Sequence, residues 1–262
     1  MSLPAHKAAL VTGSTSGIGL AIARALAAAG ARVMLNGMGN PAEIERTRAA
    51  LAAETGSEIR FNGADVSQPA QVAALVAETE AAFGAVDILV NNAGVQFVST
   101  VEDFPTEQWD RVRSIILDST FHATRAVLPG MRRRNWGRIV NLVSVHGLVA
   151  SPFKSAYVAA KHGQVGFTKT VALELAETGI TCNAICPGYV RTPLVDGQIA
   201  AQAAAHGLPP DRVIREIILA AQPSKRFVST EEVASLALFL CGEAARSITG
   251  AAIPIDGGWT AR

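Results

Sequence analysis

The residues best suited to proton chemistry are a tyrosine and a lysine four positions apart, Tyr157 and Lys161, in a predicted helix over residues 157–177. Side chains at this spacing share one helix face, although such a pair taken alone is more often a surface contact. A free tyrosine has a pKa of about 10, but a neighbouring ammonium favours the phenolate. The pair can therefore act as general base towards an alcohol or general acid towards a ketone. Ser144 comes thirteen residues earlier, and its hydroxyl can hydrogen-bond the same oxygen.

A glycine-rich turn, Thr12-Gly-Ser-Thr-Ser-Gly-Ile-Gly19, joins the first predicted strand to the first predicted helix. Small residues let the backbone approach a pyrophosphate, and a helix N-terminus offers free N–H groups and a positive dipole end. The glycine spacing differs from the general G-x-G-x-x-G fingerprint, and a tight turn without a ligand is the alternative. The position directly after a buried first strand favours dinucleotide binding.

The elements that must position these groups alternate along the chain. Strands are predicted at residues 8–12, 32–36, 58–61, 87–90, 137–143, 180–185 and 251–255, and helices at 20–29, 41–55, 67–83, 106–125, 126–133 and 157–177. Strict alternation requires parallel pairing through crossover helices. We therefore predict a single α/β domain over residues 1–262, a Rossmann-type doubly wound parallel sheet. Residues 193–227 break the rhythm, and we expect them to form a small helical substrate lid near the carboxyl ends of the strands.

The composition excludes several other classes of protein. With 262 residues, 49% hydrophobic and 17% charged, the chain can bury a full core. A formal net charge of +1 gives no field that attracts nucleic acid. We see no secretory signal and no apolar run of about 18 residues, so no membrane association is expected. The three cysteines lack disulfide or metal spacing, which predicts no metal site and a cytoplasmic location.

Taken together, these motifs resemble the short-chain dehydrogenase/reductase family. The glycine turn, Asn91-Asn-Ala-Gly94, Ser144 with Tyr157-x-x-x-Lys161, and Pro187-Gly188 carry the resemblance over nearly the whole chain. It implies hydride transfer between a nicotinamide dinucleotide and an alcohol or ketone, with Ser144, Tyr157 and Lys161 catalytic. It also implies a dinucleotide contact set that contains Tyr157 and Lys161 together with Gly13, Thr15, Ser16, Gly17, Ile18, Gly19, Asn36, Gly37, Asp65, Val66, Asn92, Ala93, Gly94, Pro187, Gly188, Val190 and Thr192.

The end of the second predicted strand bears on the choice between NAD and NADP. The segment Asn36-Gly-Met-Gly39 contains no acid to hold the two ribose hydroxyls of the adenosine. It also contains no lysine or arginine to pair with a 2′-phosphate, and neither does the glycine turn. The missing cation favours NAD.

Within the family, the chain resembles the bacterial D-3-hydroxybutyrate dehydrogenases through residues 94–96, 144–151, 154–162, 181–188, 191–195 and 256–262. This resemblance implies NAD-dependent interconversion of (R)-3-hydroxybutyrate and acetoacetate by a homotetramer. A small 3-hydroxy or 3-oxo carboxylate needs several donors and a cation in a site drier than bulk water. The resemblance assigns substrate binding to Gln96, His146, Lys154, Tyr189, Gln198 and Trp259. Tyr189 stands where the group usually carries tryptophan, which predicts a slightly wider pocket.

One departure concerns proton transfer. Family members usually carry asparagine forty-one residues before the catalytic tyrosine, where this chain has Ile116. That asparagine commonly supports a helix irregularity and a water that relays protons to the lysine. Isoleucine offers no hydrogen-bonding side chain, although the backbone carbonyl of residue 116 could still hold the water. We expect an enzyme that is slower or has a shifted pH dependence.

Two other functions remain open at this point. An NADPH-dependent 3-oxoacyl reductase would need a basic residue near the adenosine phosphate. A dinucleotide-binding protein that has lost turnover would fit Ile116, but it would have less need for the trio and the carboxylate-binding residues.

Overall fold

The computed structural model describes residues 3, 6–191, 195–196, 199, 203 and 207–261. Its centre is a seven-stranded sheet in the order β3-β2-β1-β4-β5-β6-β7, with every neighbouring pair parallel. The strands are β1 (Ala8–Val11), β2 (Arg32–Asn36), β3 (Ile59–Asn62), β4 (Ile88–Asn91), β5 (Gly137–Leu142), β6 (Ile180–Pro187) and β7 (Ala252–Ile255). The central strands are apolar runs because both of their faces are covered. The predicted doubly wound sheet is confirmed.

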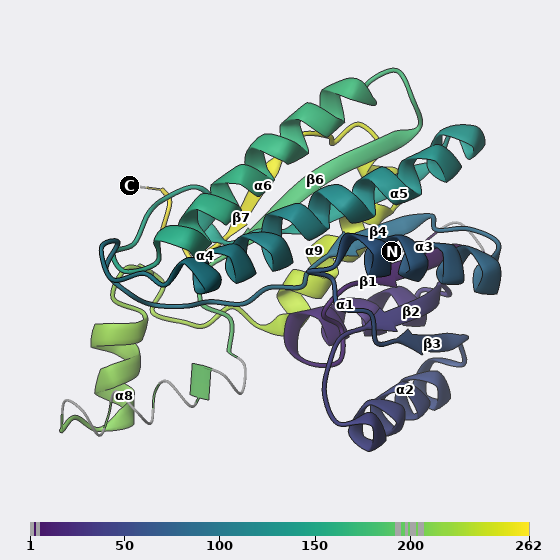
Figure 1. The fold of residues 1–262 in the computed structure, drawn as a ribbon. Helices are drawn as coiled ribbons and strands as arrows, with labels where there is room; N and C mark the ends of the chain where they lie inside the picture. Colours follow the sequence, from purple (N-terminus) through teal and green to yellow (C-terminus); the bar gives the residue numbers. More distant parts are fainter. Residues whose placement is uncertain are drawn as a thin grey trace.

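Helices cover both faces of the sheet (Figure 1). On one face, α1 (Gly17–Ala28) and α9 (Thr230–Cys241) pack against each other and share an apolar core with the strands. On the other, α3 (Pro69–Phe83), α5 (Ser119–Arg134) and α6 (Ser155–Glu174) share a second core. Helix α2 (Pro41–Thr55) lies beside β3, and α4 (Thr106–Arg113) leads into α5. None of the helices in the described ranges is long and apolar enough to cross a membrane.

Two helices differ from the prediction. Helix α9 was not predicted, although Ser229 and Glu232 form a capping box before it, a signal that the sequence carries. The predicted break after residue 125 is wrong. Helix α4, a π-helical turn (Ser114–Asp118) and α5 follow one another to Arg134 without a gap. Pro129 lies inside α5, and the packing of this helix on α3 and β4 outweighs the hydrogen bond that proline removes.

The described part of the expected lid contains a short helix, α8 (Pro210–Val213), and a second π-helical turn (Ile214–Ile218). Figure 1 shows α8 set apart from the sheet. These residues form a small apolar cluster of their own, which includes Val195, Val213 and Leu219 and packs against Tyr189. The segment therefore meets the main domain just beyond the end of β6.

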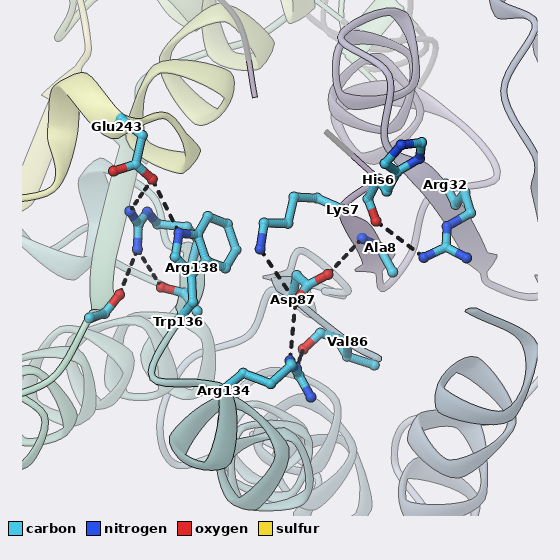
Figure 2. Close-up of polar contacts among 12 residues, drawn as sticks. His6, Lys7, Ala8, Arg32, Val86, Asp87, Arg134, Trp136, Arg138 and Glu243 are labelled. Atoms are coloured by element: carbon cyan, nitrogen blue, oxygen red, sulfur yellow. Dashed lines mark hydrogen bonds and ion pairs between the residues drawn. The ribbon is translucent and has the colours of Figure 1, made fainter. Parts of the chain in front are cut away.

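A polar network joins the amino ends of the central strands (Figure 2). The Asp87 carboxylate accepts a hydrogen bond from the Ala8 backbone N–H (3.1 Å) and forms ion pairs with Lys7 (3.9 Å) and Arg134 (3.3 Å). Lys7 also lies over the Trp136 ring, 3.7 Å from its centroid. Since ligands bind at the opposite edge of such sheets, this network stabilises the fold.

Replacing Asp87 with alanine should lower the free energy of unfolding by about 3 kcal/mol, because removing one partner of a buried pair leaves the others uncompensated. Lys7 and Arg134 are partly exposed, which keeps the loss near the lower end of the range for buried pairs. Urea denaturation measures it. As a control, Glu43→Ala removes only an exposed ion pair with Arg46 and should change stability little. Equal effects of the two changes would contradict the structural role of Asp87.

Candidate active site

Ser144, Tyr157 and Lys161 come together where β5 ends and α6 begins. Ser144 follows β5 and caps a short 3₁₀ turn, where its Oγ accepts from the His146 backbone N–H at 3.1 Å. Tyr157 lies in the first turn of α6, and Lys161 lies one turn further on. Lys161 Nζ donates to the carbonyl of Leu142, the last residue of β5, at 2.6 Å. This bond ties α6 to the strand end and keeps Nζ 5.7 Å from the centre of the Tyr157 ring.

Burial acts on both members of the tyrosine–lysine pair. Desolvation raises the pKa of Tyr157, and a hydrogen bond with Ser144 lowers it. Desolvation also lowers the pKa of Lys161 to about 7, against an opposing effect of Cys186. The charge on Lys161 is therefore sensitive to its immediate surroundings near neutral pH.

Lys161 has a second partner that the sequence analysis missed, Gln164. Lys161 Nζ donates to Gln164 Oε1 at 2.9 Å, and Gln164 Nε2 donates to Thr120 Oγ1 at 2.7 Å and to the Ile116 carbonyl at 3.2 Å. All of these side chains are buried. The sequence carries one signal for this contact. Gln164 is a polar residue one helical turn after Lys161, so the two side chains share a helix face.

The surroundings of Ile116 show which groups contact its backbone and side chain. The helix irregularity is present without asparagine, because Ile116 lies in the π-helical turn Ser114–Asp118. The Ile116 carbonyl accepts from Thr120 Oγ1 at 2.7 Å as well as from Gln164. A carbonyl oxygen has two lone pairs, so side chains of the protein supply donors for both of them. The isoleucine side chain packs with Val112, Ala160 and Tyr157.

A cavity of about 200 Å³ is lined by Ser144 and Tyr157, two of the three predicted catalytic residues. Its lining brings together most of the predicted substrate residues, namely Gln96, His146, Lys154, Tyr189 and Trp259, with Ile18, Val143, Ser144, Val145, Tyr157, Pro187, Gly188, Val190 and Val195. The Trp259 ring stacks on Tyr189 (centroids 5.8 Å apart) and meets His146 edge-on at 5.5 Å. Gln198 and Thr192 lie outside the described residues.

Two nitrogen groups that line this cavity, on His146 and Lys154, have few polar contacts to the part of the chain that the structure describes. Nε2 of His146 is buried without a hydrogen bond, while Nδ1 lies 3.4 Å from Ser144 Oγ. Desolvation lowers the pKa of His146 to about 4, aided by the charge of Lys154, so the imidazole is neutral at pH 7. Burial also lowers the pKa of Lys154. Within the described ranges, the Lys154 ammonium has no carboxylate partner. Together the two groups favour an anionic ligand.

A second cavity, about 480 Å³, lies over the glycine turn. Its lining contains the predicted residues Gly13, Thr15, Ser16, Ile18, Gly19, Asn36, Gly37, Asp65, Val66, Asn92, Ala93 and Gly94. The predicted residues Tyr157, Pro187, Gly188 and Val190 line the first cavity instead, and Gly17 and Lys161 line neither. The side chain of Ser16 does not cap α1, which leaves the first N–H groups of the helix available. This open helix end fits a dinucleotide.

Two glycines explain how the turn can be so tight. Gly13 has φ of +61°, and a Cβ there would lie 2.9 Å from Ala93 Cα. A Cβ on Gly19 would lie 2.4 Å from the Gly13 carbonyl oxygen and 2.5 Å from Asn92 Nδ2. The Asn36 amide, which donates to the carbonyls of Asn62 and Ala64, holds the same turn from β2. The cavity wall also includes Arg111, a cation that the sequence analysis missed.

The carboxylate of Asp256 determines where Trp259 lies. It accepts from the backbone N–H groups of Gly258 (2.9 Å) and Thr260 (2.8 Å) and from the Thr260 hydroxyl (2.7 Å). Asp256→Ala should raise KM for the substrate about tenfold, since each lost hydrogen bond costs about 0.5–1.5 kcal/mol. Steady-state kinetics measure it, with Thr260→Val, which removes a single bond, as the weaker comparison. An unchanged KM in both variants would show that Trp259 needs no such support.

Comparisons with known proteins agree with this geometry. Residues 13–260 match the family described as enoyl-(acyl carrier protein) reductase. The chain is 56% identical to the D-beta-hydroxybutyrate dehydrogenase of Rhizobium meliloti (strain 1021), over 98% of this chain and 99% of that protein. It is 54% identical to the D-beta-hydroxybutyrate dehydrogenase of Cupriavidus necator, with 98% of each chain covered. A solved structure of an actinorhodin polyketide ketoreductase with NADPH matches with a TM-score of 0.90 and 38% identity over 97% of both chains. The chain belongs to the short-chain dehydrogenase/reductase family of oxidoreductases.

Proposed function

We propose that this protein oxidises (R)-3-hydroxybutyrate to acetoacetate with NAD and catalyses the reverse reduction. The observation that carries the proposal is a cavity lined by two polar groups. Among the described residues, the buried Nε2 of His146 has no hydrogen-bond partner and the Lys154 ammonium has no carboxylate partner. A substrate carboxylate satisfies both groups. Ser144 and Tyr157, which would hold the reacting oxygen, line the same small cavity. The two relatives named D-beta-hydroxybutyrate dehydrogenase support this substrate.

The proposed mechanism divides the chemistry among three side chains. The Tyr157 phenolate removes the proton of the substrate hydroxyl, while Ser144 donates a hydrogen bond to the same oxygen. The Lys161 ammonium favours the phenolate over the neutral phenol. A dinucleotide held over the glycine turn would supply the acceptor for the hydride, which leaves with its electron pair from the carbon that carries the hydroxyl as the carbonyl double bond forms. Reduction follows these steps in reverse, with Tyr157 returning the proton.

The test is turnover of (R)-3-hydroxybutyrate with NAD, followed by the absorbance of the reduced nicotinamide. The (S)-enantiomer and a neutral secondary alcohol serve as controls, and both should react far more slowly. Absence of turnover above the enzyme-free background would defeat the proposal. A dinucleotide-binding protein without turnover would then be the better description.

The choice of NAD rests on the absence of a cation at the end of β2, where Asn36, Gly37 and Met38 line the cavity. Arg111, which lines the same cavity, favours the rival function, an NADPH-dependent 3-oxoacyl reductase, because an arginine can pair with a 2′-phosphate. A titration with NADH and NADPH separates the two. Tighter binding of NADPH, together with its loss in Arg111→Ala, would favour the reductase.

Two further features belong to the same proposal. Residues 193–227 act as a lid over the substrate, in agreement with the contact between their apolar cluster and Tyr189. The protein is a homotetramer, as the family resemblance implies. Light scattering coupled to size-exclusion chromatography tests the second point, and a monomeric mass would contradict it.

A further inference from the structure

Gln164 connects the active-site lysine to the opposite helix segment. Its side chain is 1% exposed and lies between Lys161 on α6 and the π-helical turn that precedes α5. The orientation of the amide follows from its partners, because an ammonium only donates hydrogen bonds and a carbonyl only accepts them. Oε1 therefore faces Lys161, and Nε2 faces the Ile116 carbonyl and Thr120 Oγ1.

This arrangement restrains Lys161. Two of its three possible donor positions are taken, by the Leu142 carbonyl at 2.6 Å and by Gln164 Oε1 at 2.9 Å. Both acceptors favour the charged ammonium and oppose the desolvation that lowers the pKa of Lys161 to about 7. The Gln164 amide cannot turn away, since both hydrogens of Nε2 are themselves bonded.

The same arrangement places a group that does not titrate next to Lys161. A water molecule at this place would accept and donate protons, whereas a glutamine amide does not titrate. The Ile116 carbonyl has both lone pairs filled, and the neighbouring side chains of Ile116, Val112 and Ala160 are apolar. Two titratable groups in the described ranges act on Lys161, Tyr157 on its own helix and Cys186 on β6. His146 after β5 contacts the Tyr157 ring. Burial raises the pKa of Cys186 to about 11.

We propose that Gln164 is a positioning residue that keeps the Lys161 ammonium charged and in place. The inference rests on the proposed function only where alcohol oxidation is the readout. The ionisation of Lys161 can be measured without any substrate.

The first experiment replaces Gln164 with leucine, which has a similar volume and no acceptor. The enzyme is labelled with ¹³C-lysine and studied without dinucleotide. The ¹³Cε shift of Lys161 should then report a pKa about one unit lower than in the native protein, a tenfold change in the ionisation equilibrium. In alcohol oxidation, the acid limb of the pH profile of kcat/KM should move to higher pH, because a less charged lysine stabilises the phenolate less. We expect kcat at pH 7 to fall about tenfold with KM for the substrate nearly unchanged.

Two variants separate positioning from general stability. Gln164→Glu keeps the acceptor for Lys161 and should return the lysine titration to the native pKa or above. Thr168→Val removes two hydrogen bonds one turn further along α6, one to the Gln164 backbone carbonyl and one from Asn141 Nδ2, without touching Lys161. This variant should lower the free energy of unfolding and leave the lysine titration and the pH profile of kcat/KM unchanged.

The proposal would be overturned if Gln164→Leu and the native protein gave the same lysine titration and the same pH profile. If Gln164→Leu fails to fold, Thr120→Val removes one anchor of the amide and should shift the lysine titration in the same direction by less. No shift in that variant would also overturn it. If the native protein does not turn over 3-hydroxybutyrate, the proposed function fails, and the lysine titration still tests Gln164.

Discussion

Replacing Tyr157 with phenylalanine should lower kcat for (R)-3-hydroxybutyrate oxidation by about 100-fold or more, the range typical of a lost general base. The phenyl ring keeps the packing against Ile116 and the edge contact with the His146 ring, so the cavity and the fold should remain. Only the proton acceptor is removed. Steady-state kinetics and the affinity for NADH, measured by fluorescence, separate loss of chemistry from loss of binding.

Ser144→Ala provides the comparison for this result. It removes the hydrogen bond that lowers the pKa of Tyr157 and one contact to the substrate oxygen, while the base itself stays. We expect a smaller loss than in Tyr157→Phe, together with a shift of the acid limb of oxidation to higher pH. A Tyr157→Phe variant with kcat within threefold of the native value would show that another group accepts the proton.

Replacing Lys154 with methionine should raise KM for (R)-3-hydroxybutyrate by about 10- to 100-fold, since a hydrogen bond to a charged group contributes about 1.5–3 kcal/mol. Methionine keeps most of the volume of the side chain in the cavity wall and removes the cation. The trio is untouched, so kcat at saturation should change little. The measurement is the substrate dependence of the initial rate at a fixed concentration of NAD.

A neutral substrate supplies the sharpest control for Lys154. The methyl ester of 3-hydroxybutyrate has no carboxylate, and its KM should be the same in Lys154→Met and in the native protein. Lys169→Met, which changes an exposed lysine of α6, controls for the loss of a positive charge in general. If Lys154→Met leaves KM for the acid unchanged, the carboxylate is held elsewhere.

The structure also clarifies why the Ile116 departure need not abolish activity. The family's asparagine was expected to support a helix irregularity and a water, and here the irregularity persists while a glutamine occupies the position next to the lysine. Ile116→Asn would place an amide among Val112, Ala160 and Tyr157. A comparison of its pH–rate profile with that of the native protein shows whether the side chain of residue 116 affects the pH dependence of the rate. Identical profiles would show that it does not.

Local patterns were sufficient for much of this protein. The alternation of apolar strands and helices implied a parallel sheet, because few other topologies connect such elements. The four-residue spacing of Tyr157 and Lys161 put them on one helix face for the same geometric reason. Helix limits were less well determined at Arg134 and at α9, where packing and a capping box decided the outcome.

Contacts between distant residues were decided by the tertiary structure alone. Gln164 and Ile116 are 48 residues apart and meet only because α6 lies against the π-helical turn. The unpartnered Nε2 of His146, the position of Arg111 on the cavity wall and the support of Trp259 by Asp256 likewise depend on which elements pack together. The sequence by itself determined the fold class and the types of residue in the active site. Only the packed structure decided which buried groups have partners, because hydrogen bonding and desolvation depend on neighbours that the sequence does not place.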